Sequence, residues 1–334
     1  VDGIEIGRET SVGQVYSEFQ DYLKELRGYG VMLNVNSKND EENALAGLNH
    51  PEGSLRPEDF ICIKANWDPK DLNFTAIAEE LNILPESMVF IDDNPAERAI
   101  VTAQVPGVSA PMMDAPEHYI TAIDRCGFFE ATKLSKDDLS RNDMYKANAE
   151  RAKLQKSFAN YEEYLSSLEM RAQIRPFEPV YIARIAQLTN KSNQFNLTTR
   201  RYTESEMQEI SENKSYITLY GKLTDKFGDN GVISVALGRI EGDTLHIELW
   251  LMSCRVLKRN MEHAMLDQLV HAARKAGVKK LRGYYYKTAK NGMVRDFYKD
   301  FGFELVSSDG EDTVWELPVD GYEDKNKIIK VNEG

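Results

Sequence analysis

Apolar positions in the first third of the chain follow two periods in turn. Between Ser11 and Leu26 they recur every three or four residues, which predicts an amphipathic helix that Gly28 and Gly30 end. The short runs Val31–Asn36 and Phe60–Asn66 are mostly apolar and are typical of buried strands. Helices are expected near 40–48, 70–81 and from 95 onward, with a third short strand at 87–91. Strands that alternate with helices predict a parallel sheet, whose functional groups gather at the C-terminal strand ends.

The pattern changes twice further along the chain. Residues 114–170 are charged and rich in helix formers, which predicts a helical connector. Beyond residue 171 we expect strands at 216–223, 231–240, 244–252, 281–287 and 313–317, and a strong helix at 261–276. The sequence therefore predicts an α/β domain over 1–113, the connector over 114–170, an antiparallel-rich α+β domain over 171–320 and a tail over 321–334.

Composition narrows the class of protein. The 334 residues carry 41 Lys and Arg against 54 Asp and Glu, a net charge of −13, which argues against general binding to nucleic acid or to an anionic membrane. Three scattered cysteines form neither a disulfide framework nor a zinc site, which is typical of a reducing compartment. There is no apolar run of about 18 residues and no signal peptide, so we expect a cytoplasmic protein.

The sharpest local signal is the run FIDDNPAER, residues 90–98. Two adjacent carboxylates at the end of a buried strand repel each other unless a cation neutralises them. One of them on a divalent ion and the other on a lysine would satisfy both, and Ser37 and Lys70 follow the two preceding strands. A hydroxyl, a lysine and carboxylates at one sheet edge predict a phosphoryl-binding site. The alternative is that Asp92 or Asp93 caps the next helix while the other is solvated.

In their order and context these residues resemble three motifs of the haloacid-dehalogenase (HAD) superfamily. The strings LNVNSKNDEENA, IKANWDPKDLN and VFIDDNPAER are similar to its FkbH-like branch, also described as a subfamily IIIC phosphatase. The resemblance implies that Ser37 binds a phosphoryl oxygen, Lys70 neutralises phosphoryl group and nucleophile, Asp92 orients Lys70 and Asp93 ligates Mg²⁺. Lys64 is a rival to Lys70 within the preceding strand.

One motif of the resemblance is missing. The family's first strand carries two aspartates, a nucleophile that forms an aspartyl-phosphate and a general acid two residues later. No such strand precedes Val1, so we expect the chain as given to lack this strand and not to complete phosphoryl transfer.

The second domain has its own signal in the basic turn between the strand 244–252 and the helix from Met261. Arg255, Lys258 and Arg259 precede a helix N-terminus, an arrangement that favours a pyrophosphate. With NGMVRDFYKDFGFE downstream, this segment resembles the GNAT acyltransferase fold. The resemblance implies binding of acetyl-CoA or of a phosphopantetheine thioester, with Asn291 and Tyr298 near the acyl group. Lys258 and Asn260 stand where the family's turn has glycines, which opposes close backbone approach.

A polar stretch at 190–203, NKSNQFNLTTRRYT, also resembles this family. Its amides and guanidinium groups could line an acyl or sugar pocket, through Asn193, Gln194, Asn196 and Arg200, or it could be a solvated loop. His246 and His263 lie near the predicted acyl site, where packing or surface roles are the more common ones for histidine.

Three functions follow from these signals. The first is an FkbH-like, Mg²⁺-dependent phosphatase and acyltransferase that dephosphorylates a phosphorylated small acid and loads the acyl group on an acidic acyl carrier protein. The second is an acyl-CoA-dependent N- or O-acyltransferase whose first domain is a scaffold. The third is a non-catalytic module that binds a carrier protein through Arg255, Lys258 and Arg259.

Overall fold

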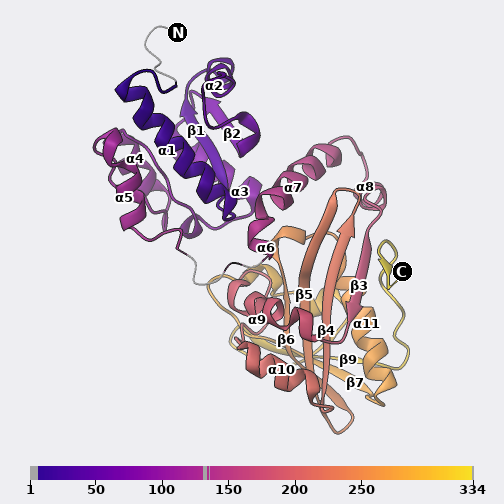
Figure 1. Ribbon diagram of the computed structural model, residues 1–334. Coiled ribbons are helices and arrows are strands. Elements are labelled where there is room, and N and C mark those ends of the chain that lie inside the picture. Colours follow the sequence, from indigo (N-terminus) through magenta and orange to yellow (C-terminus); the bar gives the residue numbers. More distant parts are fainter. Residues whose placement is uncertain (1–6, 131–133, 135, 333–334) are drawn as a thin grey trace. The chain divides into compact units, whose positions relative to one another are not determined.

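The computed structural model describes residues 7–130, 134 and 136–332 (Figure 1). It divides into two compact units, Val1–Ala149 and Glu150–Gly334. The boundary falls within helix α7 (Arg141–Gln155), so the expected connector is shared between the units. Among the described residues no helix is long and apolar enough to cross a membrane.

The N-terminal unit is built on a small parallel sheet, as predicted. Strand β1 (Leu33–Lys38) pairs in parallel with β2 (Phe60–Asn66), with Ser37 opposite Ala65 and Lys38 opposite Asn66. The third apolar segment makes an isolated parallel bridge from Val89 to Ser109. Around these strands lie α1 (Ser11–Gly28), α2 (Glu41–Leu48), α3 (Lys70–Leu81), α4 (Pro95–Gln104), α5 (Tyr119–Arg125) and α6 (Lys136–Leu139).

The core of this unit consists of several small clusters. Phe74 of α3 meets Phe90 edge-on, with ring centroids 6.0 Å apart, and Val101 of α4 packs beside them. Ile77 of α3 belongs to a second cluster with Cys62 of β2. Helix α3 therefore joins β2 to the 88–91 segment, which positions its first residue, Lys70, between them.

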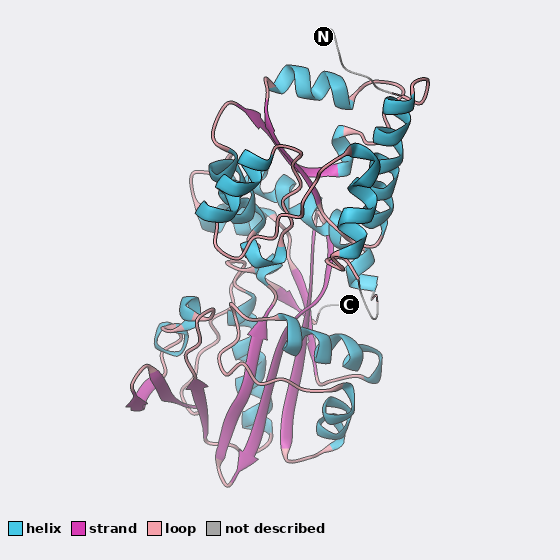
Figure 2. Cartoon of the chain, turned by 90° about the vertical axis from the view of Figure 1, so that its left-hand side faces the viewer, coloured by secondary structure: helices cyan, strands magenta, loops and turns pink. Residues whose placement is uncertain are grey.

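The C-terminal unit is an eight-stranded mixed sheet in the order β10-β3-β4-β5-β6-β7-β9-β8. Its long strands lie side by side, with helices beside them (Figure 2). Strands β4 (Tyr216–Asp225), β5 (Gly228–Glu241), β6 (Thr244–Met252), β7 (Lys280–Tyr285) and β9 (Asp312–Pro318) match the predicted ones. The sequence did not predict β3 (Arg171–Arg175), β8 (Glu304–Asp309) or β10 (Lys330–Val331). Strand β10 lies in the expected tail and pairs with β3 at the sheet edge.

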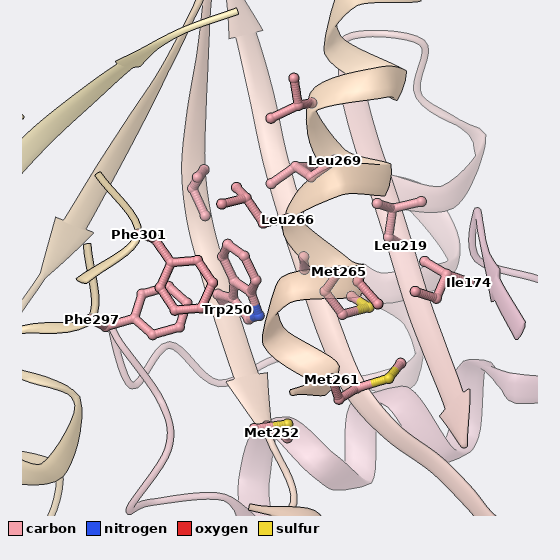
Figure 3. Close-up of a cluster of buried hydrophobic side chains, with 14 of the residues drawn as sticks. Ile174, Leu219, Trp250, Met252, Met261, Met265, Leu266, Leu269, Phe297 and Phe301 are labelled. Atoms are coloured by element: carbon pink, nitrogen blue, oxygen red, sulfur yellow. The ribbon is translucent and has the colours of Figure 1, made fainter. Parts of the chain in front are cut away.

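Helices cover both faces of this sheet. Helix α11 (Met261–Lys275) packs in the larger core with Trp250, which meets Phe297 edge-on at 4.9 Å between centroids (Figure 3). Helices α9 (Ile182–Lys191) and α10 (Glu204–Glu212) enclose a second core on the opposite face. The short helices α8 (Tyr161–Ser167) and α12 (Phe297–Asp300) complete the unit.

Candidate functional site

The predicted phosphoryl site gathers at the C-terminal edge of the parallel strands. Ser37 is half-buried near the end of β1, and Lys70 is the first residue of α3. The Asn36 amide nitrogen donates a 2.8 Å hydrogen bond to the Lys70 carbonyl oxygen. This bond ties the end of β1 to the start of α3, so Ser37 and Lys70 are held at one place.

Lys70 and Asp92 form a buried ion pair. The ammonium nitrogen lies 2.5 Å from Asp92 Oδ2, and the two side chains are only 15% and 4% exposed. The other oxygen, Oδ1, accepts a 2.9 Å hydrogen bond from the Asn94 backbone N–H. Both carboxylate oxygens of Asp92 are thus used within the protein, and Asp92 fixes the position of the Lys70 ammonium group.

Asp93 has a different environment. Its side chain is exposed and makes no hydrogen bond or ion pair with the residues that the structure describes. Arg98 Nη1 donates to the carbonyl oxygens of Asp92 and Asp93, at 2.6 and 3.0 Å, and Asn94 caps α4 by accepting from the Ala96 N–H at 2.9 Å. The alternative in which an aspartate caps this helix does not hold, because Asn94 does so.

These residues suit a hard divalent cation in a specific way. Mg²⁺ takes oxygen ligands, uses one or two carboxylates and keeps several waters. Asp93 offers a free carboxylate, and Asn36 Oδ1 is a buried oxygen without a hydrogen-bond partner. The described part of the chain holds no group of three or more His, Cys, Asp or Glu side chains that could bind a metal. A site here would therefore be of the water-rich, Mg²⁺ kind.

Sequence reasoning missed three contributors to this edge, Asn36, Asn94 and Arg98. The Asn36 and Arg98 side chains donate to the backbone carbonyl oxygens of Lys70, Asp92 and Asp93, and the Asn94 backbone N–H donates to the Asp92 carboxylate. The two asparagines in the otherwise apolar run Val31–Asn36 were the available signal, since a polar side chain there needs a local partner. Lys64, the rival to Lys70, instead pairs with Glu80 at 3.0 Å.

In the C-terminal unit the turn before α11 has an unusual backbone. Lys258 and Asn260 adopt φ of 64° and 59°, the left-handed region that glycine enters most easily. The turn therefore has a glycine-like backbone without glycine, and strain of this kind concentrates at functional sites. Lys258 is exposed, and its carbonyl oxygen accepts a 2.5 Å hydrogen bond from the Tyr161 hydroxyl.

The arginines of the same turn differ in exposure. Arg259 is 7% exposed and donates to Asp225 Oδ2 at 3.3 Å and to Asn230 Oδ1 at 3.2 Å. Burial, and then the neighbouring Arg151, lowers the pKa of Arg259 to about 10. Its guanidinium group thus points into the protein. Arg255 is half-buried, and its Nε donates to Ser253 Oγ at 3.2 Å.

Asn291 and Tyr298, expected beside an acyl group, are both fully buried. The Asn291 amide nitrogen donates to the carbonyl oxygens of Asn196 and Tyr286, at 3.0 and 2.9 Å. The ring of Tyr298 lies so close to Gly283 that an added Cβ there would come within 2.2 Å of it. Both side chains serve packing and backbone bonding in this structure.

The polar stretch 190–203 is only partly a surface loop. Leu197 N–H donates to Trp250 O at 3.0 Å, Met252 N–H to Phe195 O at 3.0 Å and Tyr286 N–H to Leu197 O at 2.9 Å. Pairing of β6 with β7 stops at Ile247 and Gly283, so residues 195–198 fill the opening between the two strands.

The four predicted pocket residues are accordingly divided. Asn196 is fully buried, Asn193 and Gln194 are half-buried and Arg200 is exposed, where it pairs with Glu248 at 3.3 Å. A thioester arm that paired with this edge of β6 would have to displace residues 195–198.

Comparison with known proteins finds similar solved structures for each part of the chain. The N-terminal part of the protein BF1531 from Bacteroides fragilis, containing a phosphatase domain complexed with Mg, is 36% identical, with a TM-score of 0.39. The match covers 40% of this chain and 36% of that one, so the chain spans about a third of its length. An acetyltransferase of the GNAT family from Streptococcus pneumoniae is 14% identical over 44% of this chain and 99% of that one, with a TM-score of 0.36.

The PaiA N-acetyltransferase from Thermoplasma acidophilum, in complex with coenzyme A, is 16% identical over 44% of this chain and 98% of that one, with a TM-score of 0.33. No protein-family model matches the chain, and no curated protein matches its sequence. The N-terminal region is similar to a phosphatase domain, and the C-terminal region is similar in fold to GNAT acetyltransferases.

Proposed function

We propose that the N-terminal unit is the phosphoryl-binding part of an FkbH-like, Mg²⁺-dependent HAD enzyme that acts on a phosphorylated small acid. The observation that carries this proposal is the buried Lys70–Asp92 ion pair, 2.5 Å long, with the exposed Asp93 beside it. In the full reaction the acyl group passes to an acidic acyl carrier protein, and the C-terminal unit presents the thiol or the acyl group.

Each residue of the site has a role that its charge determines. The Ser37 hydroxyl would donate to a phosphoryl oxygen, and the Lys70 ammonium group would balance the negative charge that develops on phosphorus and nucleophile. Asp92 keeps that ammonium group in place, while Asp93 would hold Mg²⁺. When bound, Mg²⁺ neutralises phosphoryl oxygens and orients the transferring group.

The nucleophile of this proposal belongs to an additional strand. Strand β1 pairs with β2, and Phe90 N–H bonds to Ser109 O at 2.8 Å, but the described residues form no ladder between β1 and the 88–91 segment. Lys70 contacts both elements: its carbonyl oxygen accepts from Asn36 of β1, and its ammonium group pairs with Asp92, which follows the 88–91 segment. We place one parallel strand between them, with the aspartyl nucleophile at its C-terminal end.

Phosphate release tests this function. The chain as given is compared with one extended upstream through the additional strand, with Mg²⁺ and a panel of phosphorylated three-carbon acids and sugars. We expect release from the extended chain alone, loss of it with EDTA, and loss in Asp93→Asn. If the extended chain released no phosphate from any compound of the panel, the assignment would be refuted.

A second activity, binding of an acyl thioester by the C-terminal unit, is supported by the left-handed backbone at Lys258 and Asn260 before α11. Such a turn presents backbone N–H groups at a helix N-terminus. We expect acetyl-CoA binding in calorimetry, weakened about tenfold by Arg255→Ala, because a charge-assisted contact to phosphate is lost. Lys153→Ala, at an exposed pair with Glu150 outside this turn, is the control and should retain binding. Salt-sensitive association with an acidic carrier protein, without CoA affinity, would favour a binding module instead.

A further inference from the structure

A line of titratable side chains lies on one face of β5, β6 and β7, outside both sites described above. Leu245 and Ile247 of β6 point into the core that contains α11. Successive side chains of a strand alternate between faces, so His246 points to the opposite face of the sheet. Tyr284 of β7 lies on that same face, because it contacts His246.

Three of these side chains form a continuous chain of contacts. His246 Nδ1 lies 2.6 Å from the Tyr284 hydroxyl oxygen, and the two rings are within 18° of parallel. The other ring nitrogen, Nε2, lies 3.5 Å from Glu241 Oε2 at the end of β5. A carboxylate, an imidazole and a hydroxyl in this order have the arrangement of a proton relay.

The neighbours of the two ring nitrogens favour one tautomer of His246. A neutral phenol donates to Nδ1, which leaves the imidazole N–H on Nε2, facing Glu241. Burial lowers the pKa of His246. Among its charged neighbours, Glu241 and Glu248 raise this pKa, and Arg282 and Arg239 lower it. The imidazole is therefore neutral at pH 7 and able to accept a proton.

The charged side chains around this relay are paired with one another. Leu237 pairs with Leu249 and Gly238 with Ile247, so Glu248 is the extra residue of a β-bulge, a feature that often re-aims a side chain beside an active site. Glu248 accepts from Arg239 Nε at 2.9 Å and also pairs with Arg200.

Arg282 pairs in turn with Glu316, which also pairs with Lys280, so each of these cations has a carboxylate partner. The ring of Tyr286, whose residue is 36% exposed, lies 6.1 Å from that of Tyr284 between centroids. These paired side chains keep N–H groups and oxygen lone pairs that a ligand could bond, and the tyrosine rings lie next to them. A compound rich in hydroxyl groups can bond to such groups and pack on such rings.

We propose that Tyr284, His246 and Glu241 form an acid–base site that activates a hydroxyl group of a polyol or sugar as acceptor in acyl transfer. The inference rests on the proposed acyl-transfer role of the C-terminal unit. The acceptor oxygen attacks the carbonyl carbon of an acyl ester or thioester. Its proton passes to the Tyr284 oxygen as the Tyr284 proton passes to His246 Nδ1, and Glu241 pairs with the imidazolium ion. Collapse breaks the bond to the leaving group, which regains the proton by the reverse path.

An activated ester tests the site without CoA or phosphate chemistry. The full chain is incubated with p-nitrophenyl acetate and glycerol, and both p-nitrophenol and acetylglycerol are measured. We expect catalysed acetylglycerol formation that falls at least tenfold in Tyr284→Phe and in His246→Gln. His271→Gln is the matched control, because His271 pairs with Asp324 away from the relay, and it should retain the wild-type rate.

Two further measurements separate catalysis from packing. Nitrogen-15 NMR of the histidine rings should show His246 protonated on Nε2 in the wild type. Glu241→Gln, a change of a positioning residue, should shift the pH–rate profile toward lower pH, because it removes a charge that favours the imidazolium ion and so lowers the pKa of the His246 base. Wild-type rates at the buffer level, equal rates in Tyr284→Phe, or hydrolysis without acetylglycerol would each overturn the proposal. A failure of the phosphatase or CoA experiments would leave these readouts unchanged.

Discussion

Substitution of Lys70 by methionine is expected to lower Mg²⁺-dependent phosphate release from the extended chain by about 10²–10³-fold, the usual loss when one electrostatic contact to a transition state is removed. The ammonium group of Lys70 is 2.5 Å from Asp92 and is the charge that the proposed reaction uses. Methionine keeps much of the side-chain volume and removes only this charge. The measurement is kcat/KM for the best substrate of the phosphate-release panel.

Lys64→Met is the matched control for this prediction. Lys64 lies in the neighbouring strand β2 and pairs with Glu80, with 31% of its side chain exposed. We expect its substitution to change kcat/KM by less than about twofold, since exposed pairs contribute little. An equal loss in both variants would mean that positive charge in general, and not Lys70, supports the reaction.

A double variant separates activity from folding. Lys70→Met alone leaves the buried Asp92 carboxylate without its partner, which is destabilising. Lys70→Met combined with Asp92→Asn removes both charges, so the free energy of unfolding should recover while phosphate release stays low. Recovery of activity together with stability would show that the pair has a structural role only.

The N-terminal elements could be predicted because their signals are local. The apolar run Phe60–Asn66 is β2 in the structure, and the helical period from Ser11 corresponds to α1. The site residues Ser37 and Lys70 follow these elements directly, so their shared sheet edge could be expected from the parallel topology alone. Asn36 and Arg98 could not, because their roles lie in bonds to the backbone of distant residues.

In the C-terminal unit the limits of prediction have a physical cause. Strand β8 is exposed on both faces, so it has no alternation of apolar and polar residues to reveal it. Strand β10 is only two residues long and depends on pairing with β3. The Asn291 amide donates to the carbonyl oxygen of Asn196, 95 positions away in the sequence, and no local sequence pattern predicts such a contact. The sequence favoured a surface or packing role for His246, which contacts Tyr284 only through the side-by-side pairing of β6 with β7.

The second large effect is expected at a buried cluster of two arginines and one aspartate. The side chain of Asp225, at the end of β4, is fully buried and accepts from Arg151 Nη2 at 2.6 Å and Nε at 2.8 Å. Arg259 Nη1 lies 3.3 Å from the same carboxylate, and the arginine side chains are only 4% and 8% exposed. One carboxylate thus neutralises two guanidinium groups beneath the turn that precedes α11.

Asp225→Asn is therefore expected to lower the free energy of unfolding of the C-terminal unit by about 3–5 kcal/mol, because it leaves two buried cations without a counter-charge. Arg259→Met should cost clearly less, since Asp225 and Arg151 remain a complete two-bond pair. Denaturant unfolding followed by tryptophan fluorescence measures both, because Trp250 and Trp315 lie in this unit. Lys153→Ala, at an exposed pair with Glu150, is the control for a surface charge. If Arg259→Met destabilised as much as Asp225→Asn, Arg259 would contribute mainly by packing, and the shared carboxylate would not be the source of the stability.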